Sequence, residues 1–518
     1  MIVKKIDFGE DAQSKLIKGI DTIANAVKST LGARGSTVLI ESSEHIGGIT
    51  ITKDGITVAR SINLEDAVEN LAVMLVREAS SRTADQAGDG TTSAIVLTQA
   101  IIHNALTVIK VSDNRIEVIR SMQRSVDDIV MELSKISESV DDRTLVDVAR
   151  ISANNDDEIG GIISDAYSKV GVNGVVTVEN SDGSATYCDI SEGMRLSRGY
   201  TSRYFITDKK TSECILENPY VMVLNHVIEN LNGIEKVLAD VMKMGRSILI
   251  IGELSQNVLN TLNLNRARNG MKVCCILPPQ FGWKKNEMME DIAHVTGATY
   301  FSEDTGDNLQ LVRLDDLGRL KRAVISSDTT IMIRSDDTND LTNDLVAKLW
   351  EESSVSREQD FVKERIAVIS GQVGVIHVGA DSDIELKEKR DRVDDAVCAT
   401  RAALEDGVLP GGGVALRDIK LKPKKNSVSE RIGYGIVEKS LSATFNQILS
   451  NAGLSSPEKP FSKGRGYDVN TEKVGRMMDM GIIDPTKVVK SAVINAISVA
   501  TTILSTNAII TNVRESNR

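Results

Sequence analysis

The amino-acid sequence predicts a multidomain α and α/β protein, and three observations lead to this prediction. The chain has 518 residues, which is too long for one ordinary hydrophobic core, so two or three domains are expected. Apolar residues recur at helical spacing near both ends of the chain. The middle instead alternates short apolar runs with helical patterns, which indicates a layered α/β module. The pattern alone leaves open whether the two helical ends form one domain.

The helical ends are recognised by their periodicity. The first extends from residue 9 to about residue 134 and the last begins near residue 406. One helix of the last segment is expected to begin at Asp484 and Pro485, with the aspartate as N-cap and the proline in the first helical position. The uncharged run 492–510 contains several polar residues, so we interpret it as a buried amphipathic helix and not as a membrane span.

The middle of the chain contains three apolar runs that are expected to be buried strands. They comprise residues 220–224, 248–251 and 273–277. A helical pattern over residues 234–242 lies between the first two runs and ends at Gly245. No G-x-G-x-x-G motif follows any of these runs, which disfavours a dinucleotide-binding enzyme.

Composition and charge exclude other classes of protein. The net charge of −12 argues against nonspecific binding of nucleic acid, which needs a basic surface. No apolar signal segment follows Met1, and the five cysteines show no C-x-x-C spacing. We therefore expect a cytoplasmic protein with reduced thiols and no contact with a membrane.

The most informative motif is the segment 87–93, which reads AGDGTTS and leads directly into an apolar helix. Its glycines let backbone N–H groups converge, and a helix N-terminus carries positive partial charge, so phosphate is the natural ligand. Asp89 is a candidate ligand for a divalent metal that bridges such phosphates. Taken alone, the motif would be read more simply as a side-chain-capped helix start. No Walker A motif occurs in the chain, which disfavours a P-loop ATPase.

Three further glycine-containing turns each have an ordinary structural interpretation. Residues 30–35 read TLGARG, and Gly32 could be a helix C-cap. Residues 51–55 read ITKDG, which is typical of a hairpin turn. Residues 411–413 are three glycines that would usually be a flexible joint.

Together these motifs resemble the group I chaperonins of the GroEL type. The segments 30–32, 53–55, 87–92 and 411–413 occur in the order found in that family. So do three more segments: residues 151–154 (ISAN), 401–403 (RAA) and 479–488 (DMGIIDPTKV). The resemblance covers nearly the whole chain and the last segment is highly specific, so the sequence is identified as a divergent member of this family.

The resemblance implies a chaperonin subunit with three domains. Residues 1–134 and 406–518 would form a helical equatorial domain that binds ATP. Residues 135–191 and 374–405 would form a small intermediate domain, and residues 192–373 an α/β apical domain that binds substrate. The implied activity is ATP-dependent folding of unfolded proteins inside a ring cavity. A chaperonin-like holdase or scaffold with little ATP turnover is the alternative.

The implied partners follow from the same resemblance. They are copies of the chain itself in seven-membered rings, single or back-to-back, together with unfolded client proteins and a lid co-chaperonin. Asn446 stands where the family has an arginine at the contact between rings, so a weaker contact is expected there. The loop after it, residues 453–466, also lacks the family's acidic run.

The resemblance also implies the residues of an ATPase site. Asp395 would orient the attacking water, and Asp54 would be a second catalytic carboxylate. Asp89 would bind Mg²⁺, and backbone oxygens of Thr30 and Lys53 would bind K⁺. Positioning and charge neutralisation suffice for phosphoryl transfer. The implied ATP contacts are Thr30, Leu31, Gly32, Ala33, Lys53, Asp89, Gly90, Thr91, Thr92, Ser93, Gly412, Asp468, Val469, Asn470 and Asp484.

A groove for clients is implied in the α/β part. Its residues would be Tyr200, Tyr204, Phe205, Leu238, Leu259, Leu262 and Leu264. Ordinary core packing is the alternative, above all for some of the leucines. Glu235 and Asn263 fall on groove positions that are apolar in the family, and Asp468 stands where the family usually has asparagine. The groove is therefore expected to be weaker or more selective, and nucleotide affinity to differ.

Overall fold

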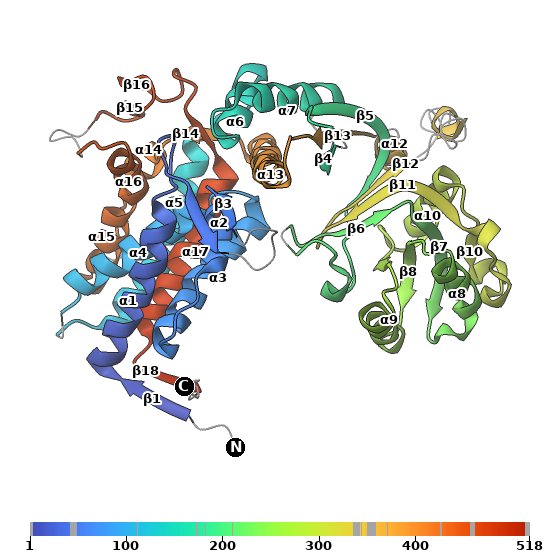
Figure 1. Cartoon of the computed structure of the whole chain (residues 1–518), viewed down its shortest axis with the longest axis horizontal. Helices are drawn as coiled ribbons and strands as arrows, with labels where there is room; N and C mark the ends of the chain where they lie inside the picture. The colour runs from blue at the N-terminus through green and yellow to red at the C-terminus, as the bar shows by residue number, and fades with distance from the viewer. Residues whose placement is uncertain are drawn as a thin grey trace. The chain divides into compact units, whose positions relative to one another are not determined.

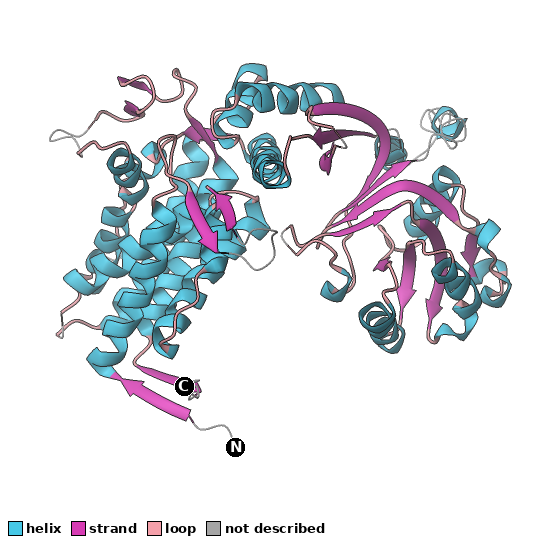
Figure 2. Cartoon of the chain, in the orientation of Figure 1, coloured by secondary structure: helices cyan, strands magenta, loops and turns pink. Residues whose placement is uncertain are grey.

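The structure is a computed structural model, and it divides into two compact units. A helical unit comprises Met1–Asp165, Val178–Tyr187 and His377–Arg518, and an α/β unit comprises Ala166–Thr177 and Cys188–Ile376 (Figure 1). Helices predominate in the first unit, and the second combines a sheet with helices (Figure 2). The fold class predicted from the sequence is confirmed. The described residues are 4–41, 49–110, 112–171, 175–181, 183–209, 211–334, 342, 344–349, 359–369, 371–424, 427–455 and 461–512.

The helical unit is built around a layer of long helices from both ends of the chain. Helix α17 packs against α3, α4 and α5, while α1 packs against α3 and α4. Their apolar faces form one buried core. The helices are α1 (Gly9–Lys28), α2 (Gly55–Ser61), α3 (Ala67–Ala87), α4 (Thr91–Val108), α5 (Arg115–Ile136), α6 (Asp142–Ser152), α7 (Asp157–Val170, which continues past the unit boundary), α13 (Asp383–Asp406), α14 (Val414–Arg417), α15 (Val428–Ser440), α16 (Ala443–Asn451) and α17 (Thr486–Ser505).

Four two-stranded ribbons complete the helical unit as far as its residues are described. Strand β1 (Lys4–Phe8) pairs antiparallel with β18 (Ala508–Asn512), so the two ends of the described chain lie side by side. The other ribbons are β2 (Val38–Glu41) with β3 (Ile49–Thr52), β14 (Val408–Pro410) with β17 (Ile483–Pro485), and β15 (Arg465–Asp468) with β16 (Lys473–Arg476).

Two local predictions for the C-terminal segment need correction. The run 492–510 is only partly helical, because α17 ends at Ser505 and the chain then enters β18. This helix is apolar and long enough to cross a membrane, but 72% of its most apolar window is buried inside the protein, as expected for a core helix. Pro485, not Asp484, occupies the N-cap position of α17, and no side-chain cap is made there. The carboxylate of Asp484 instead accepts from the N–H groups of Gly412 and Gly413.

The α/β unit is organised by a mixed sheet. The strand order is β4-β13-β5-β12-β11-β7-β8-β9, with β10 also paired to β7 and β6 to β11. Strands β10, β7, β8 and β9 run parallel. The strands are β4 (Val175–Asn180), β5 (Tyr187–Leu196), β6 (Cys214–Glu217), β7 (Tyr220–Ile228), β8 (Ile248–Leu254), β9 (Val273–Ile276), β10 (Tyr300–Ser302), β11 (Gly318–Ile325), β12 (Thr330–Arg334) and β13 (Gln372–Val378). The three strands predicted from apolar runs are confirmed as β7, β8 and β9.

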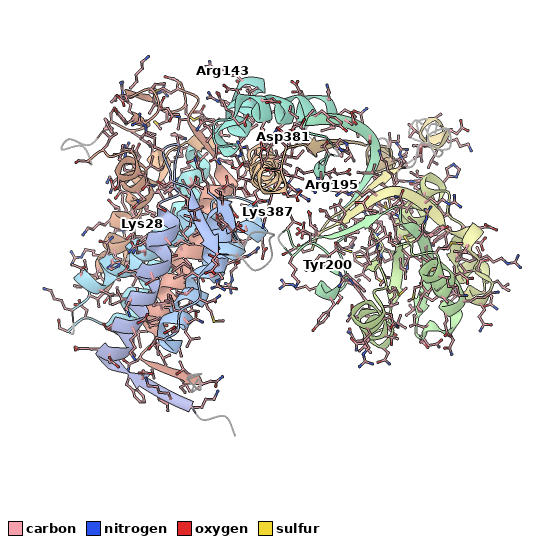
Figure 3. The ribbon with its side chains drawn as sticks, viewed as in Figure 1. Lys28, Arg143, Arg195, Tyr200, Asp381 and Lys387 are labelled. Atoms are coloured by element: carbon pink, nitrogen blue, oxygen red, sulfur yellow. The ribbon has the colours of Figure 1, made fainter. Side chains whose placement is uncertain are left out.

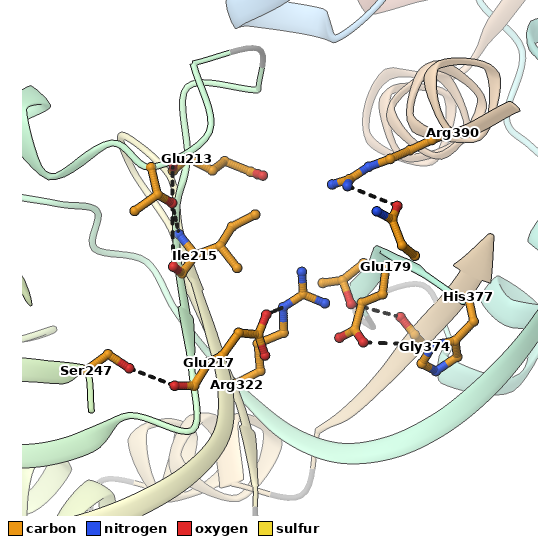
Figure 4. Close-up of polar contacts among 12 residues, drawn as sticks. Glu179, Glu213, Ile215, Glu217, Ser247, Arg322, Gly374, His377 and Arg390 are labelled. Atoms are coloured by element: carbon orange, nitrogen blue, oxygen red, sulfur yellow. Dashed lines mark hydrogen bonds and ion pairs between the residues drawn. The ribbon is translucent and has the colours of Figure 1, made fainter. Parts of the chain in front are cut away.

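Helices connect the parallel strands, as the alternating pattern predicted. They are α8 (Glu235–Lys243), α9 (Gln256–Asn269) and α10 (Trp283–Thr296), whereas α12 (Gln359–Ile369) lies between β12 and β13 in the chain. Short 3-10 turns occur at η1 (Arg203–Phe205), η2 (Leu231–Gly233), η3 (Glu303–Thr305), η4 (Leu309–Leu311) and η5 (Leu314–Asp316). Polar contacts also tie neighbouring segments: Ser247 Oγ donates to the backbone oxygen of Glu217, whose carboxylate pairs with Arg322 at 3.2 Å (Figure 4).

The α5–α15 contact gives a test of this packing. A Cβ atom at Gly433 of α15 would lie 2.7 Å from the backbone oxygen of Val118 in α5, whereas a Cβ at Gly435 would meet no atom within 4 Å. We expect Gly433→Ala to lower the free energy of unfolding by about 1–3 kcal/mol, because the helices must separate. Gly435→Ala should raise it by about 0.5–1 kcal/mol through helix propensity. Thermal denaturation of both variants checks this; equal melting temperatures would contradict the close contact.

Candidate functional site

A cavity of about 540 Å³ in the helical unit brings together segments that are far apart in the sequence. Every residue predicted to contact ATP lines it, and so do the two predicted catalytic carboxylates, Asp54 and Asp395. The contributing segments include the loop after α1, the start of α2, the α3–α4 turn, the end of α6, α13, the glycines before α14, α16, the β15–β16 turn, the end of β17 and the first turns of α17. The roles of the individual residues stay predictions.

The α3–α4 turn forms the floor of the site through its glycines. Gly88 caps α3 at φ 73° and Gly90 is the N-cap of α4 at φ 81°, in the left-handed region that favours glycine. A Cβ at Gly88 would lie 2.2 Å from Cβ of Cys398, and one at Gly90 would lie 2.6 Å from Cγ1 of Val488. Gly90 provides no side-chain cap, so the interpretation as a side-chain-capped helix start is wrong. The first N–H groups of α4 lack intrahelical partners and suit an anion.

Two carboxyl groups beside this turn are held in an unfavourable environment. Burial, with the nearby charge of Asp54, raises the pKa of Asp89, although the N–H of Gly90 donates to its carboxylate. Burial raises the pKa of Asp484 to about 7, and the charge of Asp89 adds to that increase. Both side chains retain some surface that faces the cavity. A cation bound in the cavity would relieve this repulsion.

Asp54 has a structural role as well as a place in the cavity. Its carboxylate caps α2 by accepting from the N–H groups of Ile56 at 3.2 Å and Thr57 at 3.0 Å. The Asp-Gly pair therefore starts a helix and is not the tip of a hairpin. A Cβ at Gly55 would lie 2.1 Å from Oγ1 of Thr92, which brings the start of α2 against the start of α4.

The loop after α1 is fixed by a residue that sequence reasoning missed. Nδ2 of Asn451, in α16, donates to the backbone oxygens of Lys28 and Leu31, both at 2.8 Å. Gly32 is not the C-cap of α1, because Ser29 occupies that position. A Cβ at Gly32, where φ is 85°, would lie 3.1 Å from the side chain of Ile448. The two hydrogen bonds from Asn451 fix the position of the loop that carries Thr30 and Ala33.

One part of the cavity wall is apolar. Phe445, Val469 and Met477 belong to a small buried cluster there and also line the cavity. Asp468 uses its carboxylate within its own turn, since it accepts from the N–H of Asn470 at 2.9 Å and the hydroxyl of Thr471 at 2.5 Å. These donors partly offset the negative charge that Asp468 adds where the family usually has asparagine.

Asp395 approaches the cavity from α13 together with residues that were not predicted. Asp391, one turn earlier, is buried and lines the same wall. Arg150, in α6, also lines the cavity; it pairs with Asp147 at 3.2 Å, and its Nε is buried without a hydrogen-bond partner among the described residues. Asn154 and Asn155 follow α6 with φ of 60° and 63°. The ISAN motif was the only signal that could have pointed to this segment.

The charge of the cavity favours a ligand that arrives with cations. Eight lining residues are acidic and three are basic, so phosphate alone would be repelled. The described residues form no cluster of three or more His, Cys, Asp or Glu side chains that could hold a metal by themselves. Mg²⁺ usually takes one or two carboxylates and completes its shell with phosphate oxygens and water, so Asp89 fits this role when a nucleotide supplies the other ligands.

The predicted client groove is only partly supported by the positions of its residues. Phe205, Leu238 and Leu262 are buried in the core of the α/β unit, so the prediction that their side chains line an open groove is wrong for these three. Tyr200, labelled in Figure 3, and Leu259 pack partly buried against that core.

Two of the predicted groove residues do present apolar surface. Tyr204 is 75% exposed and Leu264 52% exposed. Of the polar substitutions, Asn263 donates to Ser202 Oγ at 3.1 Å and is part of the local packing, whereas Glu235 is exposed at the start of α8.

Comparison with known proteins agrees with the motif order. The sequence model of the TCP-1/cpn60 chaperonin family matches residues 23–514. The fold is similar to two crystal structures of the chaperonin gp146 from the bacteriophage EL 2 (Pseudomonas aeruginosa), both obtained in the presence of ATP-BeFx. Each is 21% identical in sequence, with 98% of this chain and 99% of that chain covered, and the TM-scores are 0.68 and 0.64.

The raised pKa of Asp484 generates a pH prediction. Because the folded protein holds this proton more tightly than the unfolded chain, ionisation costs stability as pH rises from the ordinary value of 3.8 to about 7. Asp484→Asn keeps an acceptor for Gly412 and Gly413 but cannot ionise. We expect it to raise the melting temperature of the nucleotide-free protein more at pH 8 than at pH 5. Asp479→Asn, at an exposed carboxylate, is the control. An equal effect of Asp484→Asn at both pH values would refute the assignment.

Proposed function

The chain belongs to the TCP-1/cpn60 chaperonin family, and from this premise we propose that it is an ATP-hydrolysing chaperonin that binds unfolded proteins and promotes their folding. The observation that carries the proposal is the single cavity that collects all fifteen predicted nucleotide contacts and both predicted catalytic carboxylates. The presence of ATP-BeFx in the crystals of the phage relative supports a nucleotide as the ligand. The proposed location is the cytoplasm.

The proposed nucleotide position follows from the chemistry of the cavity walls. The phosphates would lie over the N-terminus of α4, whose first backbone N–H groups lack intrahelical partners, and beside Gly412 and Gly413. The base and ribose would lie towards the apolar wall of Phe445, Val469 and Met477. Bound Mg²⁺ would neutralise charge on the phosphates. Asp89 would hold that ion, and backbone oxygens of Thr30 and Lys53 would hold K⁺.

Hydrolysis would depend on three groups that line the same cavity, one each from α13, the start of α2 and α6. Asp395 would orient a water molecule and accept its proton, with Asp54 as the second carboxylate near the same phosphate. Arg150 would contribute positive charge near the phosphates, since its Nε has no protein partner among the described residues and few other cations line this wall.

Assembly and client binding are part of the same proposal. Rings of seven copies, single or back-to-back, would enclose the client, and a lid co-chaperonin would close the cavity. In the α/β unit, Tyr204 and Leu264 offer exposed apolar surface for unfolded segments. Asn446 remains the proposed weak point between rings; residues 456–460 of the neighbouring loop lie outside the described residues.

The catalytic assignment predicts different effects at two aspartates. We expect Asp395→Ala to bind ATP normally but to hydrolyse it about 100-fold more slowly, because general base catalysis is lost. Asp89→Ala should instead weaken magnesium-dependent ATP binding itself. Asp394→Ala is the matched control on α13, because Asp394 pairs with Arg390 and does not line the cavity. Phosphate release and ATP titration check both. Wild-type turnover in Asp395→Ala would exclude its catalytic role, and negligible turnover in the wild type would favour the holdase alternative.

The client surface predicts that Tyr204→Glu loses most capture of unfolded protein while ATP turnover is kept. A charge at this exposed position should oppose burial of apolar segments without disturbing the core. Leu311→Glu, at another exposed apolar residue of the α/β unit, is the control and should capture clients normally. Suppression of aggregation of a denatured client protein is the measurement. Full activity of Tyr204→Glu would rule out this surface.

A further inference from the structure

A second cavity, of about 330 Å³, lies within the α/β unit and has no part in the proposed ATPase. Its polar lining comes from Asn225, His226, Glu253, Lys285, Asn286 and Glu303. These residues belong to β7, β8, α10 and the turn after β10. The cavity is small, at the lower end of the range of about 300–1,000 Å³ typical of small-molecule sites.

The cavity lies at the point in the sheet where the order of the parallel strands reverses. The chain passes from β7 to β8 and then β9 on one side, and returns to place β10 on the other side of β7. Figure 1 labels β8, β7 and β10. All four strands run parallel, and the cavity residues lie at or just beyond their carboxyl ends. In parallel α/β sheets, ligands bind at such a point, where the strand order reverses.

An irregularity in β7 opens space at this point. Val223 pairs with Ile251 and Val227 pairs with Glu253, so four steps along β7 correspond to two along β8. The residues between these pairs include Asn225 and His226, which both line the cavity. Bulges of this kind redirect side chains and are frequent beside functional sites.

The polar side chains around the cavity are held by hydrogen bonds to one another. Asn225 Nδ2 donates to Asn286 Oδ1 at 3.1 Å and to Ser302 Oγ at 3.2 Å. The hydroxyl of Tyr300 also donates to Asn286 Oδ1, at 3.2 Å. Lys285 pairs with Glu253 at 3.3 Å. Such a network fixes side-chain directions before a ligand arrives, which lowers the entropic cost of binding.

One group in the cavity lacks a hydrogen bond. Nε2 of His226 is shielded from solvent and has no hydrogen-bond partner among the described residues. A buried polar atom left in this state costs stability, and a ligand with a matching group would remove that cost. A hydroxyl matches either tautomer of the imidazole, because it can both donate and accept.

We propose that this cavity binds a neutral, polyhydroxylated small molecule such as a monosaccharide. Amide and carboxylate side chains match the mixed donors and acceptors of neighbouring hydroxyl groups. Glu253 and Glu303 carry two negative charges against the one positive charge of Lys285, so the cavity disfavours a phosphorylated or carboxylated ligand. The site is separate from the nucleotide cavity, whose lining residues all belong to the helical unit.

The test is to titrate the protein with four neutral probes: glycerol, D-ribose, D-glucose and myo-inositol. Binding is measured by ligand-observed NMR and by the shift in melting temperature. Ribose 5-phosphate is the anionic comparison. We expect saturable binding of at least one neutral probe with a dissociation constant of millimolar order or below, and weaker binding of the phosphate. His226→Gln and Glu303→Gln should each weaken that binding about three- to tenfold, as expected for one lost hydrogen bond. His294→Gln, at an exposed histidine of α10 outside the cavity, should bind as the wild type does.

Three results would overturn the proposal. One is no saturable binding of any neutral probe up to about 20 mM, well above the expected millimolar range. The second is binding that His226→Gln and Glu303→Gln leave unchanged, and the third is tighter binding of ribose 5-phosphate than of the neutral probes. Both variants lie outside the nucleotide cavity, so ATP turnover measured in parallel reports separately on the proposed function.

Discussion

The site depends on the close approach of two helices, α13 and α17, to the turn between α3 and α4. Cys398 of α13 and Val488 of α17 leave no room for a Cβ at Gly88 and Gly90, so the backbone of this turn is fixed by helices from the other end of the chain. Asn495 of α17 strengthens the contact by donating to Thr83 at 3.1 Å and Gln86 at 3.0 Å in α3. A change in the position of α13 or α17 would therefore shift the backbone of this turn, where the phosphates are proposed to bind.

The charges in the cavity explain why a ligand that carries cations would stabilise the protein. The carboxyl groups of Asp89 and Asp484 have raised pKa values because they are enclosed by protein and lie near other carboxylates. Enclosing these carboxyl groups lowers the stability of the folded protein. A nucleotide bound with its cations would offset that loss. The cavity in the α/β unit shows a milder form of the same arrangement, because Nε2 of His226 has no hydrogen-bond partner in the part of the chain that the structure describes.

Local sequence patterns predicted the helices and strands better than they predicted the tertiary contacts of individual residues. The strands β7, β8 and β9 were predictable because buried parallel strands are continuous apolar runs. Asp484 was misjudged as a helix cap, because its competing partners, Gly412 and Gly413, are about seventy residues away. Phe205 was expected at a surface and is fully buried, while Arg150 and Asn451 were missed. In each case the deciding contact is tertiary, and no short-range pattern encodes it.

The most direct test of the central claim is calorimetric titration of ATP into the wild-type full-length protein, with Mg²⁺ present and then with Mg²⁺ removed by a chelator. The acidic cavity predicts one saturable site per chain when Mg²⁺ is present and much weaker binding without it, because eight acidic residues and three basic ones line the walls. Absence of ATP binding, or binding of equal strength with and without the metal, would contradict the account.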